Sequence, residues 1–238
     1  FILLYLARHG KVFKIRPQHA INVIEEAVGR ATEMGRPVVM NLGGGGLRRG
    51  EYAPPTIAGA TVLSHIARLT AKYGTKLIVP LATGESSETI PLATEVVREA
   101  YLKEGRINDF NADEMIRYIP SNSTVMALAE REMPAANVMV GYFWHESLIF
   151  AEAYGRVGAM QVGGTSNLYQ IPFFAGACEY VLIGEEIFAV GAFINPTPEL
   201  TSSIAVQDIW KIISVVLTIV GLVAALAGNN SLVTILRT

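Results

Sequence analysis

The stretch PVVMNLGGGG, residues 37–46, decides the fold class that the sequence predicts. Within it, Val38–Leu42 is a short run, rich in valine and mainly apolar on both faces of any strand it forms. Such strands are typical of parallel sheets that helices cover on both sides. Gly35 and Pro37 end the helix-like stretch before the run, and four glycines follow it. We therefore expect a buried parallel strand that ends in a glycine loop.

Five further runs of the same kind follow along the chain. They are Lys76–Leu81, Met115–Ile119, Asn137–Tyr142, Gly158–Val162 and Tyr180–Ile183. Helix-like stretches occupy the gaps, as parallel connections require. Helices are expected at about 17–35, 56–73, 89–105, 121–133, 146–154 and 185–193. The sequence thus predicts an α/β fold, doubly wound and Rossmann-like in the broad sense, with a mainly parallel sheet of about six strands.

The composition excludes several classes of protein. Of 238 residues, 51% are apolar and only 17% are charged, against about 25% charged in a typical soluble domain. This argues against disorder and a coiled coil. With 19 Lys and Arg against 21 Asp and Glu, there is no basic footprint for nucleic acid. The single cysteine, Cys178, excludes an internal disulfide and a cysteine-based zinc site. No metal is expected, and no cofactor can be named.

Much of the apolar excess lies near the C-terminus. Ile209–Ala227 reads IWKIISVVLTIVGLVAALA, and 19 residues at 1.5 Å each give roughly 28 Å, enough to cross a hydrocarbon core. Trp210 and Lys211 suit an interfacial anchor, and Gly228-Asn229-Asn230 ends the helix. We expect a transmembrane helix over 204–228 and a short extracytoplasmic tail over 229–238. The alternative is a buried helix of a soluble core.

The N-terminal stretch FILLYLA, residues 1–7, is also apolar and turns basic at once. Arg8, Lys11, Lys14 and Arg16 follow it, and basic residues beside a membrane exit favour the cytoplasmic side. We expect residues 1–9 to end a second transmembrane helix, with a cytoplasmic α/β domain over 10–200, in a multi-pass protein of the cell membrane. The alternatives are an apolar strand or a processed terminus.

Five segments carry a resemblance to a known family. They are Glu25–Val38, His65–Pro80, Glu95–Arg106, Pro134–Ala153 and Pro172–Glu186. Together they resemble an uncharacterised prokaryotic family of membrane-anchored α/β (Rossmann-like) domains flanked by transmembrane helices. The resemblance implies membrane helices around the domain and assigns no catalytic residues. The glycines at 43–46 and His145 depart from the family's pattern.

Candidate ligand residues follow the strands, because doubly wound sheets bind ligands at the carboxyl ends of their strands. They are Gly43, Gly44, Gly45, Thr83, Gly163, Gly164, Thr165 and Ser166. Glycine N–H groups, with Arg48 and Arg49, would suit a nucleotide or another anion. The glycines match neither GxGxxG nor a Walker loop. The alternatives are a flexible loop at 43–46, a helix entry at Thr83 and a tight turn at 163–167.

The adjacent residues His145, Glu146 and Ser147 do not predict catalysis, because neighbours on a helix point about 100° apart. Two functions remain open. The first is a membrane scaffold or assembly protein that forms a homo-oligomer, with lipid and other membrane proteins as expected partners. The second is a ligand-binding or enzymatic module at the carboxyl ends of the strands. Convergence of loops 43–49, 83–87 and 163–167 into one pocket would favour the second.

Overall fold

A computed structural model describes residues 2–11, 13, 19–118 and 123–226. Its contacts divide the chain into two units, one of residues 16–195 and one that joins residues 1–15 with 196–238. Each unit is described by itself. Several predicted features lie outside the described residues. They are Lys14, Arg16, Pro17, Ile119, Ser121, Asn122 and residues 227–238.

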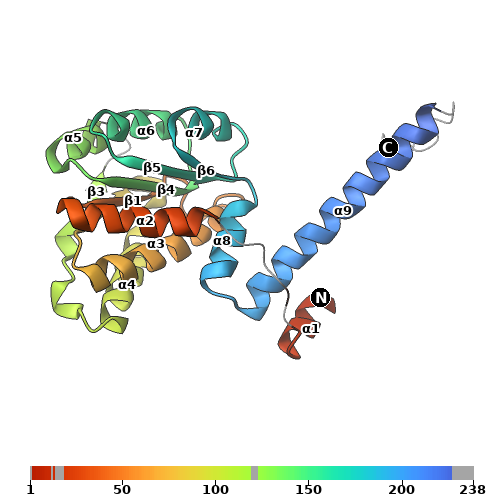
Figure 1. The fold of residues 1–238 in the computed structure, drawn as a ribbon, viewed down its shortest axis with the longest axis horizontal. Helices are drawn as coiled ribbons and strands as arrows, with labels where there is room; N and C mark the ends of the chain where they lie inside the picture. Colours follow the sequence, from red (N-terminus) through yellow and green to blue (C-terminus); the bar gives the residue numbers. More distant parts are fainter. Residues whose placement is uncertain (1, 12, 14–18, 119–122, 227–238) are drawn as a thin grey trace. The chain divides into compact units, whose positions relative to one another are not determined.

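The larger unit contains a six-stranded sheet in the order β3-β2-β1-β4-β5-β6, and every neighbouring pair is parallel (Figure 1). The strands are β1 (Val38–Gly43), β2 (Leu77–Ala82), β3 (Met115–Tyr118), β4 (Ala136–Tyr142), β5 (Met160–Thr165) and β6 (Tyr180–Ile183). The predicted doubly wound α/β class is therefore confirmed.

Helices cover both faces of the sheet (Figure 1). One layer holds α2 (His19–Met34), α3 (Ala53–Tyr73), α4 (Thr89–Lys103) and α8 (Glu186–Ile194). The other holds α5 (Ser123–Glu132), α6 (Glu146–Arg156) and α7 (Ile171–Ala177). Short 3₁₀ turns lie at η1 (Gly84–Ser86), η2 (Ile107–Asp109) and η3 (Ala112–Glu114). Alternate strand residues serve the two layers: Met40 packs toward α3, whereas Val39 packs toward α6.

Two elements, β5 and α7, differ most from the sequence prediction. Strand β5 begins at Met160 rather than Gly158, because Gly158 has a φ of 72° and still belongs to the turn. Gly163 therefore lies inside the strand, where a Cβ would stand 2.6 Å from Phe174 Cδ1. The glycine is needed for α7 to pack on the sheet. Helix α7 itself was not predicted.

The strand order places a topological switch point between β1 and β4. The chain leaves β1 through α3 toward β2, and leaves β4 through α6 toward β5, so the two connections diverge. The strand ends are tied closely: a Cβ on Gly43 would stand 2.1 Å from the Tyr142 carbonyl oxygen, and one on Gly141 would stand 2.0 Å from that of Leu42. Only glycine permits this approach.

The smaller unit contains α1 (Ile2–Arg8) and α9 (Pro198–Leu226). Arg8 Nη2 lies 2.8 Å from Glu199 Oε1, which ties the two helices together. At 29 residues, α9 is about 43 Å long. Among the described helices, α9 is long and apolar enough to cross a membrane. It begins at Pro198, six residues before the start of the predicted transmembrane span at residue 204. Trp210 near its apolar stretch is 63% exposed.

Candidate functional site

The switch-point edge is built by three loops. They are 43–49 after β1, 83–88 after β2 and 142–146 after β4. Gly45 N donates to the Tyr142 carbonyl at 3.2 Å, which joins the first loop to the third. The Ser86 hydroxyl donates to the Gly44 carbonyl, which joins the first loop to the second. The structure therefore brings Gly43, Gly44 and Gly45 to one edge with residues that follow β2 and β4.

A carboxylate of the chain itself holds the glycine loop. Glu88 Oε1 accepts from Leu47 N at 2.8 Å, and Arg48 Nε lies 3.5 Å from Glu88 Oε2. A Cβ on Gly46, whose φ is 71°, would stand only 2.8 Å from Glu88 Oε1. The carboxylate thus takes the position beside the loop that an anionic ligand would need.

Three of the loop's N–H groups, those of Gly43, Gly45 and Leu47, donate to acceptors of the chain itself. Gly43 N donates to Asn41 Oδ1 at 2.8 Å, while Gly45 N and Leu47 N donate to the partners given above. A phosphate at this loop would have to displace these oxygens and would meet the carboxylates of Glu88 and Glu146. The anion site that the glycines predict therefore stays a prediction, with two carboxylates beside it.

Beneath the loop lies a buried polar cluster formed by Asn41, Tyr118 and Glu146. Their exposures are 0%, 3% and 7%. Within the described chain, no hydrogen-bond partner is present for Asn41 Nδ2 or for Glu146 Oε1. Burial raises the pKa of Tyr118, and the charge of Glu146 raises it further. The Asn41 amide is near enough to oppose that shift, although its geometry completes no hydrogen bond with the Tyr118 hydroxyl.

The cluster continues below α6 to Tyr154. This side chain is fully buried, and its hydroxyl has no hydrogen-bond partner among the described residues. Burial raises its pKa, with a smaller contribution from Tyr118. Both tyrosines are therefore neutral at physiological pH and present hydroxyl groups to the site.

The residues His145, Glu146 and Ser147 diverge, as their helical spacing predicts. Ser147 is fully buried and donates to Gln170 Oε1, His145 is exposed at the start of α6, and Glu146 turns toward Gly44. These three residues do not form a catalytic set. Among the described residues, no group of three His, Cys, Asp or Glu side chains gathers that could hold a metal ion.

Three aromatic rings lie beside the glycine loop. The Tyr52 and Tyr142 ring centroids are 4.3 Å apart, and Trp144 stands edge-on to both at 5.2 and 5.5 Å. Tyr52 is buried, whereas Trp144 is 41% exposed. The Arg49 guanidinium lies 5.5 Å from the centre of the Tyr52 ring. The ring cluster is therefore already in contact with one cation.

The other predicted ligand residues have structural partners. Thr83 Oγ1 donates to the Tyr118 carbonyl at 3.0 Å. Gly163 and Gly164 lie inside β5, where Cβ atoms would crowd Phe174 and Leu182. This corrects the expectation that both belong to the turn.

The turn after β5 contacts only one of the site's loops. Thr165 Oγ1 accepts from Asn167 N at 3.2 Å, and Asn167 Nδ2 donates to the Phe143 carbonyl at 2.9 Å. Ser166 is half-buried. The 163–167 segment thus meets the loop after β4 rather than the glycine loop.

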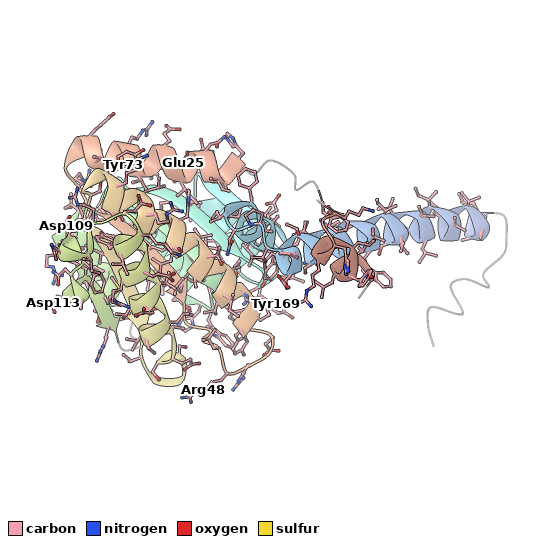
Figure 2. The ribbon with its side chains drawn as sticks, turned by 90° about the horizontal axis from the view of Figure 1, so that it is seen from below. Glu25, Arg48, Tyr73, Asp109, Asp113 and Tyr169 are labelled. Atoms are coloured by element: carbon pink, nitrogen blue, oxygen red, sulfur yellow. The ribbon has the colours of Figure 1, made fainter. Side chains whose placement is uncertain are left out.

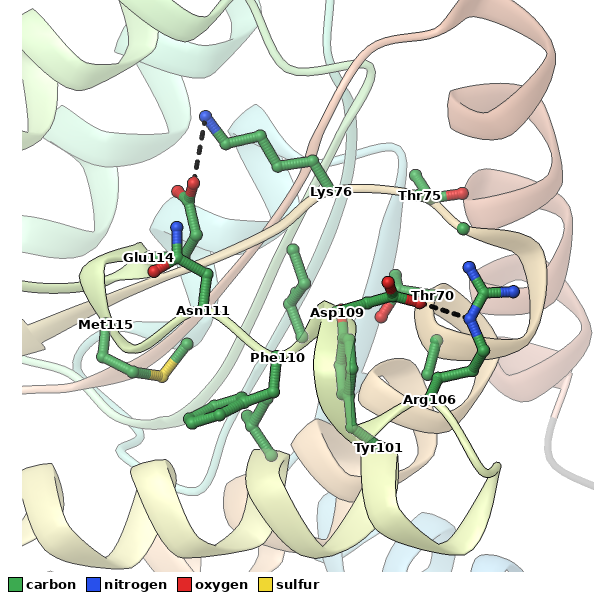
Figure 3. A pocket seen from close by; sticks show the side chains of 14 residues that line it. Thr70, Thr75, Lys76, Tyr101, Arg106, Asp109, Phe110, Asn111, Glu114 and Met115 are labelled. Atoms are coloured by element: carbon green, nitrogen blue, oxygen red, sulfur yellow. Dashed lines mark hydrogen bonds and ion pairs between the residues drawn. The ribbon is translucent and has the colours of Figure 1, made fainter.

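A separate cavity of about 370 Å³ lies at the opposite, amino-terminal edge of β2 and β3 (Figure 3). Lys76 Nζ there pairs with Glu132 at 2.8 Å and with Glu114 at 3.4 Å, and Arg106 pairs with Asp109. Figure 2 shows Asp109 far from Arg48 at the switch-point edge. The four charged side chains that line this cavity, Lys76, Arg106, Asp109 and Glu114, are thus each paired within the described chain.

Comparison with known proteins identifies the family of this chain. The chain belongs to the DUF6754 family. The family model, described as a domain of unknown function, matches residues 1–236. No curated protein and no solved structure matched the chain. The match agrees with the expected uncharacterised family and assigns no chemistry to the DUF6754 domain.

The sequence prediction missed Asn41 and Tyr118 and treated Glu146 as a helix start. Asn41 carried a signal, since it is an amide inside an otherwise apolar strand of the DUF6754 chain. Tyr118 and Glu146 carried none, because only the strand order brings β3, β1 and the start of α6 together.

Glu88→Gln is expected to loosen the glycine loop at neutral pH. Burial alone would raise the pKa of Glu88, but the Leu47 N–H and the charge of Arg48 together hold it below the ordinary value of 4.5. Because the folded pKa is the lower one, the carboxylate stabilises the loop above about pH 4.5. That contribution is lost as pH falls through the lowered pKa.

The measurement is amide hydrogen exchange of residues 43–49, corrected for intrinsic rates. We expect about tenfold faster exchange in Glu88→Gln at pH 7, since a charge-assisted hydrogen bond becomes a neutral one. The difference from wild type should vanish at low pH. Glu99→Gln is the control, because Glu99 lies on the same helix but pairs with Lys103. Equal protection in all three proteins at pH 7 would contradict the assignment.

Proposed function

We propose that this protein is a membrane-anchored domain that binds a small polar ligand at the switch-point edge of its sheet. The observation that carries the proposal is a pair of buried atoms, Asn41 Nδ2 and Glu146 Oε1, neither of which has a partner within the described chain. They lie where sheets of this strand order receive their ligands. The long apolar helix α9 supports the membrane anchor.

Unpartnered buried groups are costly. A buried polar atom without a hydrogen bond costs about 1–3 kcal/mol, and most such atoms in folded proteins are paired. Glu146 lies in the first turn of α6, and its Oε1 has no hydrogen-bond donor within the described chain. A ligand that donates to Glu146 and accepts from Asn41 would remove both costs. An ordered water is the competing explanation.

Glu146→Gln is expected to remove the bound ligand without harming the fold. The full chain, solubilised in mild detergent, should carry a co-purified small molecule that native mass spectrometry detects. Glu152→Gln is the matched control, because Glu152 lies on the same helix, is exposed and pairs only with Arg156. We expect the molecule in wild type and Glu152→Gln and its loss in Glu146→Gln.

The ligand-free stability gives a second readout. Because Glu146→Gln keeps the shape of the side chain and Oε1 has no hydrogen bond to lose within the described chain, the melting temperature of the empty protein should change little. A fall of several degrees would show that Glu146 is a structural residue. Absence of a co-purified molecule from wild type, together with such a fall, would refute the proposed function.

A second candidate function is that of a membrane scaffold which self-associates. Three exposed apolar residues around the start of α7 favour it: Leu168, Tyr169 and Phe173, with exposures of 76%, 85% and 42%; Figure 2 labels Tyr169. Membrane anchoring would hold all copies in one plane and reduce the rotational cost of association. A second copy of the chain is the partner we propose, since homo-oligomers with closed symmetry are the usual outcome. Other membrane proteins are a second class of partner.

Leu168→Ser combined with Tyr169→Ser is expected to convert an oligomer into a monomer. The mass of the protein in dodecyl maltoside at micromolar concentration, from light scattering, measures this. Leu102→Ser is the control, since Leu102 is 53% exposed on a different helix. A monomeric wild type, or an oligomer that survives the double substitution, would exclude these residues as the interface.

We also propose that the α/β domain faces the cytoplasm and that residues 1–9 end a second span. The basic residues Arg8, Lys11, Lys14 and Arg16 support this orientation. In sealed inside-out vesicles, added protease should digest the domain, whereas in right-side-out vesicles it should not. Digestion in right-side-out vesicles alone would reverse the orientation.

A further inference from the structure

The cavity at the amino-terminal edge of β2 and β3 combines an apolar lining with charged side chains. Its volume of about 370 Å³ lies at the low end of the range for ligand pockets, about 300–1,000 Å³. Leu77, Val97 and Met115 are buried in its lining. The half-buried Phe110 ring stands edge-on to Tyr101, with 6.1 Å between the ring centroids. The cavity therefore has room for a small molecule with a short apolar part.

Two ion pairs lie at separate ends of this cavity (Figure 3). Arg106 pairs with Asp109 at one end. At the other end, Lys76 Nζ lies 3.4 Å from Glu114 Oε1. Figure 3 shows the Tyr101 ring between the pairs. Burial raises the pKa of its hydroxyl, the charges of Asp109 and Glu114 raise it further, and Arg106 opposes the rise. Both pairs therefore act on one space, in which two positive charges balance two negative ones.

The Arg106 end offers unused hydrogen-bond donors. Arg106 binds Asp109 through Nε, and within the described chain neither of its Nη groups has a hydrogen-bond partner. The guanidinium borders the cavity together with Gly74, and the Arg106 side chain is 46% exposed. The two Nη groups of a guanidinium form a fork that binds a carboxylate through two parallel hydrogen bonds. This end is therefore suited to a carboxylate.

The other end holds a carboxylate that is only loosely paired. Lys76 Nζ donates to Glu132 Oε2 at 2.8 Å, which is closer than its approach to Glu114. Glu132 also accepts from Arg131 Nε at 2.9 Å. The Glu114 side chain is 23% exposed and borders the cavity. An ammonium group of a ligand can therefore bind Glu114 without breaking the bond between Lys76 and Glu132.

We propose that this cavity is a second binding site, which takes a short ω-amino acid, a linear zwitterion whose two charges are separated by methylene groups. Its carboxylate binds the Nη groups of Arg106, and its ammonium group binds Glu114. The methylene chain between them packs on Phe110 and Met115. This inference goes beyond the proposed function, because it concerns the opposite edge of the sheet and none of the residues of the switch-point site.

Other ligands fit the cavity less well. An ion of one sign would disturb the balance of charge and leave one end without a partner. An α-amino acid carries its two charges on adjacent carbons, so it would reach only one of the two pairs. The reverse orientation of the ω-amino acid is disfavoured, because Asp109 is already bonded to Arg106 Nε and Lys76 to Glu132.

The test uses the full chain in dodecyl maltoside and phosphate buffer, so that neither supplies an amine or a carboxylate. The probes are 3-aminopropanoate, 4-aminobutanoate, 5-aminopentanoate and 6-aminohexanoate, titrated at millimolar concentration by isothermal calorimetry and by thermal unfolding. We expect binding and a raised melting temperature with an optimum of chain length. Pentanoate, pentylamine and 2-aminopentanoate are the controls, because they lack the ammonium group, the carboxylate and the separation of the charges.

Two variants locate the binding. Arg106→Gln removes the carboxylate fork, and Glu114→Gln removes the partner of the ammonium group. Each should weaken binding of the best probe about tenfold, since each removes a hydrogen bond between charged groups. Arg98→Gln and Glu99→Gln are the matched controls. Both residues are exposed on α4, pair with Glu95 and Lys103 and do not line the cavity.

Several results would overturn the inference. They are the absence of binding by all four probes, equal binding of any of the three control compounds, and binding that Arg106→Gln and Glu114→Gln leave unchanged. Glu146→Gln separates this site from the proposed function, because binding of the probe should persist in it. Loss of the probe in Glu146→Gln but not in Glu114→Gln would place the amino acid at the switch-point edge, which would support the proposed function and refute the second site.

Discussion

The close approach of β1 and β4 is the constraint on which the rest of the domain depends. The carbonyl oxygens of Leu42 and Tyr142 stand where Cβ atoms on Gly141 and Gly43 would otherwise be. This contact fixes the two central strands in register up to the carboxyl edge, where the register shifts by one bulge. From there the chain must diverge, and the divergence brings the start of α6, with Glu146, beneath the glycine loop.

The fold could be predicted because each strand is short, apolar and separated from the next by a helix. Strand β6 has the predicted bounds, β1 and β4 differ from theirs by one residue at one end and β2 by one residue at both ends, whereas β5 begins two residues and ends three residues later than predicted. The failure at β5 has a physical cause. Gly163 and Gly164 have low strand propensity, yet tertiary packing of Phe174 and Leu182 requires them inside the strand. At β5, the packing of these side chains therefore outweighs the low strand propensity of glycine.

The site was harder to predict, because its chemistry depends on which loops meet. Glycines after a strand indicate a phosphate loop when their N–H groups are free. Here Asn41 Oδ1 accepts from Gly43 N, the Tyr142 carbonyl accepts from Gly45 N, and Glu88 accepts from Leu47 N; two of these three acceptors lie far away in the sequence. The same contacts carry negative charge to the loop. A pattern that predicts an anion site in sequence lies, in three dimensions, beside two carboxylates, those of Glu88 and Glu146.

Glu146 and the loop above it are linked energetically. Gly44 of the loop lies beside Glu146. The Ser86 hydroxyl donates a hydrogen bond to the Gly44 carbonyl, and Glu88 accepts one from Leu47 N. These are a few half-buried hydrogen bonds, each with a net worth of about 1 kcal/mol, so the loop is expected to open more easily than the sheet. The sheet below it, buried on both faces, does not share that weakness. Access to Glu146 can therefore change by loosening the loop alone, while Asn41, Tyr118 and the strands that carry them stay in place.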